Sequence, residues 1–154
     1  MTEFRWADAD TRVVAPLLPT PLDDDAQLAH AYAAAVWSCL VEPGDRIAGA
    51  LVSALGPEAA LREVLTGARG GVAADAAGLS REELRGGLDR WRPRLDREQI
   101  AFAIRAAVHA RVHLVTPADE RWPSALTDLG PYAPLCLWVR GDPRSLSRIA
   151  PAYW

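Results

Sequence analysis

The chain has 154 residues, of which 50% are hydrophobic and 24% are charged, and its formal net charge is −3. This composition is typical of a globular chain and excludes wholesale disorder. The acidic balance also excludes attraction of nucleic acid by the chain as a whole, so any such contact must come from a local basic patch. All 17 basic residues are arginine, whose planar guanidinium can bind phosphate through two hydrogen bonds.

The two cysteines and the terminal segment indicate the compartment. Cys39 and Cys136 each lie in an apolar run, which is typical of buried free thiols in a reducing cytoplasm. Residues 1–6 contain no apolar stretch of the kind that a signal peptide needs. No uninterrupted apolar run approaches the ~20 residues of a membrane span. We therefore expect a cytoplasmic chain with no membrane partner.

The first half of the chain predicts helices behind a flexible arm. Residues 1–22 contain three prolines and no clear hydrophobic period, which is typical of an arm. The three aspartates at 23–25 can cap a helix over residues 26–41, where apolar residues recur at helical spacing. Asp45 can cap a second helix, and Gly56 ends it. Pro57 then opens a third helix at its first turn.

Two further helices are predicted before residue 111. Residues 66–79 are rich in glycine and alanine, and we expect a loop there. Ser80 and Glu83 have the spacing of a capping box at the start of the next helix, which carries Trp91 on its apolar face. Asp96 restarts a helix after Pro93. The helical domain is thus expected to cover residues 23–110.

From residue 111 onwards the pattern changes to short strands. Residues 112–116 and 135–139 are β-prone, a turn-rich connection joins them, and a short helix is expected over residues 144–149. The second strand is apolar at every position, which is typical of a strand buried on both faces of a parallel α/β sheet. Two strands alone are marginal in water. We expect residues 111–154 to open a larger α/β domain; alternatively, the helices wrap this small sheet well enough.

A family resemblance rests on two adjacent motifs. Residues 115–126 (VTPADERWPSAL), followed by residues 134–142 (PLCLWVRGD), resemble the DprA or Smf family of bacterial DNA-processing proteins. That family has a TP-acidic-aromatic-Pro-x-x-Leu stretch and then a Pro-x-Leu-x-Val-x-Gly strand before its nucleotide-fold core. Residues 37–65 are similar to the family's helix-hairpin-helix-like segment. The resemblance covers most of the chain from about Tyr32 to Asp142.

The resemblance implies a fold and a function. The fold would be mainly α, with a helix-hairpin-helix or SAM-like domain followed by the first strands of an incomplete Rossmann-like α/β domain. The function would be binding of single-stranded DNA and assistance in loading the RecA recombinase during natural transformation, with a possible homodimer. This chemistry is not covalent, so neither a catalytic residue nor a cofactor is expected.

The chain departs from the family pattern at two places. A helix-hairpin-helix turn commonly carries two glycines, but here Gly44 is followed, two positions on, by Arg46. Residues 145–154 contain no Gly-Ser-Arg loop, the element that opens the family's core and is tied to binding single-stranded DNA. We therefore expect a truncated form that binds single-stranded DNA weakly or not at all by itself.

The candidate nucleic-acid contacts are a glycine and five arginines. Arginine can bind phosphate, and a tryptophan between arginines, here Trp91, can stack on a base. Acidic residues interrupt the arginine cluster around Trp91. The competing interpretation is therefore a helix face that only contacts solvent. The candidates are Gly44, Arg46, Arg90, Arg92, Arg94 and Arg140.

His109 and His113 are four residues apart, but no carboxylate or cysteine partner is placed near them, so no metal site is predicted.

Two other classes of function compete with the DNA-processing hypothesis. A helical protein-interaction module would use the tryptophans and the unfinished sheet as a docking surface, for example for another copy of the chain. A Rossmann-type enzyme would need a core that this sequence does not contain.

Overall fold

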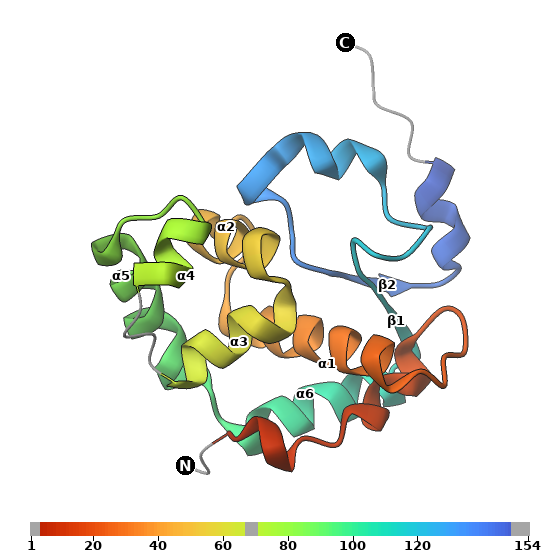
Figure 1. The fold of residues 1–154 in the computed structure, drawn as a ribbon. Helices are drawn as coiled ribbons and strands as arrows, with labels where there is room; N and C mark the ends of the chain where they lie inside the picture. Colours follow the sequence, from red (N-terminus) through yellow and green to blue (C-terminus); the bar gives the residue numbers. More distant parts are fainter. Residues whose placement is uncertain (1–3, 67–70, 149–154) are drawn as a thin grey trace.

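The computed structural model describes residues 4–66 and 71–148, and helices dominate this part of the chain (Figure 1). The helices are α1 (Asp25–Leu40), α2 (Arg46–Leu55), α3 (Pro57–Thr66), α4 (Gly71–Ala76), α5 (Arg81–Trp91) and α6 (Arg97–His109). Short 3-10 segments are η1 (Trp6–Asp8), η2 (Thr11–Leu17), η3 (Arg92–Arg94), η4 (Ser124–Tyr132) and η5 (Pro143–Arg148). The strands are β1 (Val112–Val115) and β2 (Leu137–Arg140). The mainly α fold is thus confirmed.

Local capping explains where the helices begin. The Asp24 carboxylate accepts a hydrogen bond from the Ala26 backbone N–H at 2.8 Å, and Asp96 does the same for two backbone N–H groups of α6. Ser80 and Glu83 form the predicted capping box, in which each side chain accepts from the other's backbone N–H. The predicted starts of these helices are confirmed. The expected loop at 66–79 contains α4, which the sequence analysis did not predict.

The N-terminal segment differs from the flexible arm that its prolines suggest. Phe4, Val14 and Leu17 are buried in the main core, and η2 packs against α1 and α6. Arg12 also forms ion pairs with Asp23 and Asp25, which tie η2 to the start of α1. The apolar residues lack a helical period because η2 is a 3-10 helix with three residues per turn, so the usual template misses them.

Trp37 lies at the centre of the helical core. Its indole is fully buried, its Nε1 donates to the Pro57 carbonyl at 2.9 Å, and its ring meets the Trp91 ring edge to face at 5.3 Å. This contact satisfies the one polar atom of a large apolar group and joins α1, α3 and α5. The cluster of buried residues continues past residue 110, since Leu114 and Cys136 belong to it.

The two strands pair antiparallel, and β1 and β2 are the only strands in the part of the chain that the structure describes. This pairing differs from the parallel sheet of which an all-apolar strand is typical. The expectation of complete burial of the second strand is wrong, because Trp138 is 38% exposed. Its side chain shares a face with Leu114, which is buried, and its Nε1 donates to Ser38 Oγ at 3.2 Å. The side chains of β2 are thus alternately half-buried and exposed.

The connection between the strands packs on the helical body. Figure 1 shows η4, in light blue, ending beside α2. Gly49 lies close to the backbone of η4, where an added Cβ would overlap the Pro131 carbonyl oxygen. Within residues 4–66 and 71–148, no helix combines the length and apolarity needed to cross a membrane.

Replacing Gly49 with alanine tests this close packing. The new Cβ would overlap backbone atoms of η4, which cannot swing away as a side chain can. We expect Gly49→Ala to lower the free energy of unfolding by ~1–3 kcal/mol in urea denaturation. The matched control is Gly86→Ala on α5, whose new Cβ meets only the Arg90 side chain at 3.8 Å. That variant should gain ~0.5–1 kcal/mol from helix propensity, and equal effects of the two substitutions would contradict the packing.

Candidate nucleic-acid interface

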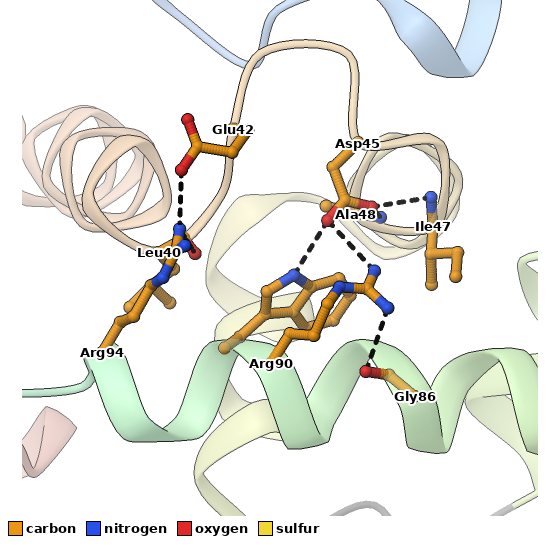
Figure 2. Close-up of polar contacts among 9 residues, drawn as sticks. Leu40, Glu42, Asp45, Ile47, Ala48, Gly86, Arg90 and Arg94 are labelled. Carbon is orange, nitrogen blue, oxygen red and sulfur yellow. Dashed lines mark hydrogen bonds and ion pairs between the residues drawn. The ribbon is translucent and has the colours of Figure 1, made fainter.

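The turn between α1 and α2 holds the first two sequence candidates. Gly44 has a φ of +86°, a conformation that residues with side chains rarely adopt. The next residue, Asp45, caps α2 by accepting hydrogen bonds from the backbone N–H groups of Ile47 and Ala48, both at 3.1 Å. Figure 2 shows this turn facing the C-terminal end of α5. The turn is therefore shaped by a glycine and an aspartate.

Asp45 also connects the turn to α5. Its Oδ2 accepts from the Trp91 Nε1 at 3.0 Å and from the Arg90 guanidinium at 3.3 Å (Figure 2). Burial acts to raise the pKa of Asp45, but the hydrogen bonds from Trp91, Ala48 and Arg90 outweigh it, so the pKa lies below its ordinary value. The carboxylate is ionised and acts as a shared acceptor.

Two further arginines near the turn, Arg46 at the start of α2 and Arg94 in η3, also have carboxylate partners. Arg46 pairs with Glu83, whose pKa is lowered first by the hydrogen bond from the Ser80 backbone N–H and then by Arg46. Arg94 donates to the Leu40 carbonyl and to Glu42, both at 3.1 Å. Each cationic candidate of this region is thus matched by an anion, which removes most of the positive potential expected from the sequence.

The remaining candidates, Arg92 and Arg140, lie elsewhere. The Arg92 Nε donates to the Val64 carbonyl at 3.2 Å, so its guanidinium lies by α3. Arg140 is exposed and is the last residue of β2, a strand that lies on the opposite side of the molecule from α5 in Figure 1. The structure therefore brings Gly44, Arg46, Arg90 and Arg94 together and leaves these two apart.

The chemistry of this site is reversible contact with a polyanion. The Arg90 and Arg94 side chains are 55% and 48% exposed, and exposed ion pairs are worth only ~0–1 kcal/mol, so a phosphate can compete with the protein's own carboxylates. Glu42, whose side chain is 80% exposed, would repel that phosphate. A tight phosphate site does not result from this balance.

The sequence analysis missed the role of Asp45 beyond capping. An N-cap aspartate is recognisable from its position before an apolar period, but its second partner, Trp91, is 46 residues away. A tryptophan on an apolar stripe was interpreted as part of a buried face. The burial is confirmed, since Trp91 is 1% exposed, and the indole N–H on Asp45 is what makes that burial possible.

The histidines and cysteines do not form a common centre. His109 ends α6 and His113 lies in β1, separated by Arg111 at a φ of +53°. Within the described ranges no three histidine, cysteine or acidic residues are placed to hold a metal ion. Both cysteines are free thiols, and burial raises the pKa of Cys136 to about 12, which makes it a poor nucleophile.

Comparison of the chain with family models, curated proteins and solved structures found no match.

Replacement of Asp45 should destabilise the chain more than replacement of an ordinary cap. Asp45→Ala removes the α2 cap, worth ~1 kcal/mol, and leaves the Trp91 N–H without its acceptor, worth a further ~1–3 kcal/mol. Asp24→Ala, which removes one exposed capping bond at α1, is the matched control and should cost only ~1 kcal/mol. Urea denaturation measures both; a difference below ~0.5 kcal/mol, the spread of ordinary surface substitutions, would contradict the shared-acceptor role.

The lowered pKa of Asp45 predicts a loss of stability in acid. Because the folded state holds the ionised form, the stabilisation is complete above the ordinary carboxyl pKa of ~4 and is lost as the pH falls through that value towards the lower folded pKa. Asp45→Asn keeps a capping oxygen without the charge. The difference in unfolding free energy between the wild type and this variant should shrink from pH 6 to pH 3. A difference that stays constant over this range would contradict a stabilising role for the charge of Asp45.

Proposed function

We propose that the chain belongs to a DNA-processing protein of the DprA type, which handles single-stranded DNA and assists RecA loading in natural transformation. The observation that carries the proposal is the unit formed by residues 115–142. The first motif begins at Val115, the last residue of β1, and the second motif contains β2, so the antiparallel pair joins the two motifs where Val115 lies opposite Leu137. Motifs that pack together as one unit support a common origin better than two isolated matches would.

The helical part supports the same proposal at a finer level. We propose that α1, α2 and α3 form a helix-hairpin-helix or SAM-like unit. The turn at Gly44 and the break at Gly56, with φ values of +86° and +81°, lie where the pattern of helix, Pro-Gly turn, helix, Gly and helix requires them. We also propose that β1 and β2 are the first strands of a Rossmann-like sheet.

The charges indicate which part of the protein would bind DNA. The arginines of the turn are matched by carboxylates, so we propose that most of the affinity for single-stranded DNA resides in the Rossmann-like core. Arg140, which is exposed at the end of β2, would lie nearest to that core. The proposed activity is non-covalent and needs neither a catalytic residue nor a cofactor; its partners are single-stranded DNA and RecA, with a possible homodimer.

A helical protein-interaction module without DNA binding is the second candidate. The observation that favours it is a group of exposed apolar side chains on η4 and β2. Leu129, Tyr132 and Trp138 are 48%, 55% and 38% exposed, respectively. Exposed aromatic groups of this kind are typical of docking surfaces.

Binding of a labelled oligothymidine separates the two candidates. The DNA-processing proposal predicts weak binding at low salt, lost at high salt, with a preference for the single strand over a duplex of the same length, because phosphate contacts release counterions. Fluorescence anisotropy at two salt concentrations measures this. The chain should also retain RecA in a pull-down with purified proteins.

The interaction-module candidate predicts a different pair of results. The chain would bind neither form of DNA and would self-associate in size-exclusion chromatography with light scattering. Absence of both DNA and RecA binding would overturn the DNA-processing proposal, whereas a monomer at high concentration would count against self-docking.

A further inference from the structure

A second basic region lies away from the α1–α2 turn. It is a cavity of about 690 Å³ between the N-terminal segment, the end of α3 and η3. Three arginines and two aromatic residues line it, and none of its described lining residues is acidic. They are Arg5, Arg62, Arg92, Phe4 and Trp6. A concave site of this size and lining is suited to a small anionic group with an aromatic ring.

Arg62 and Trp6 form one wall of the cavity. The Arg62 guanidinium lies over the Trp6 ring, 5.7 Å from its centroid. The Trp6 ring in turn meets Tyr32 edge to face at 5.9 Å, which ties it to α1. Both the cation and the indole are therefore held in place before any ligand arrives, so little conformational entropy is lost on binding.

Arg92 is a second arginine that lines the cavity. Its Nε is used by the Val64 carbonyl at 3.2 Å, which fixes the side chain and leaves both terminal amino groups of the guanidinium for a ligand. Among the residues that the structure describes, neither Arg62 nor Arg92 has a carboxylate partner. Arg46, Arg90 and Arg94 all have one. In a chain of net charge −3, the cavity is thus a local exception.

We propose that this cavity binds one nucleotide unit of single-stranded DNA. The phosphate would lie against Arg62 and Arg92, and the base would lie beside Trp6, whose ring is only partly buried. Guanidinium groups match phosphate oxygens in geometry, and an indole ring can stack on any unpaired base. Bases in a duplex are already stacked and paired, so the cavity selects a single strand. This inference rests on the proposed function and adds a binding site to it.

The test uses the full chain and three arginine variants. We expect Arg62→Gln and Arg92→Gln each to weaken binding of labelled oligothymidine at low salt by about 3- to 10-fold and to reduce the salt slope by about 1, because each removes one phosphate contact. Arg85→Gln is the matched control: it removes the same charge from an exposed position on α5 that lines none of the described cavities. Its effect should stay below about 2-fold.

Competition by two small ligands shows whether the cavity binds a nucleotide or phosphate alone. Thymidine monophosphate should displace the labelled oligothymidine at a lower concentration than inorganic phosphate does, because only the nucleotide reaches the aromatic wall. Equal competition by the two would overturn the nucleotide assignment. Thermal unfolding followed by circular dichroism verifies that each variant is folded. Arg62→Gln is the decisive variant because the described hydrogen bond of Arg62, from Thr66 Oγ1, uses its backbone carbonyl and is kept after the substitution.

The remaining outcomes separate this site from the proposed function. If oligothymidine binds and both cavity variants behave like Arg85→Gln, the cavity is not the site, and binding of single-stranded DNA stands. If the chain binds no oligothymidine, the cavity proposal is wrong, and the RecA measurement decides the proposed function separately.

Discussion

The hydrogen bond between the Trp91 indole and the Asp45 carboxylate holds the helical body together. Asp45 ends the α1–α2 turn and starts α2, while Trp91 ends α5 and packs edge to face on Trp37. The Trp37 N–H in turn bonds the first residue of α3, Pro57. Four helices are thus joined by two indoles whose polar atoms are both satisfied, which is the condition under which tryptophan can be buried in a core.

This interaction has a consequence for the candidate site. Holding Asp45 ionised next to α5 attracts Arg90, and the same region places Glu42 by Arg94 and Glu83 by Arg46. The arginines that look like a nucleic-acid patch in the sequence therefore stabilise contacts between helices. Arg92 is different, because the 3-10 turn η3 directs it to Val64 and away from these acids. A change of two positions along the chain, from Arg90 to Arg92, separates an arginine paired with a carboxylate from one that lines a cavity.

The sequence predicts what is decided locally and fails where distant segments meet. The caps at Asp24, Asp45, Ser80 and Asp96 were predictable because each acts within three residues. The strands were located to within about two residues from β propensity alone. Their antiparallel pairing, the burial of Phe4 and the cavity between Trp6, Arg62 and Arg92 depend on contacts between residues that are far apart in the sequence. No periodicity records such contacts, so these features emerged only from the structure.

The second strand, β2, is apolar in sequence but is not completely buried. Its residues alternate between half-buried and exposed, although all but Arg140 are apolar. A sequence under pressure only to keep this sheet soluble would place polar groups at the exposed positions, as half-solvated antiparallel sheets commonly do. Trp138 retains a large ring there, anchored by one hydrogen bond to Ser38. We propose that another structural element covers the exposed part of this ring. Under the DNA-processing proposal that element would be a further strand of a Rossmann-like sheet in the same polypeptide, and under the interaction-module proposal it would be a docked partner.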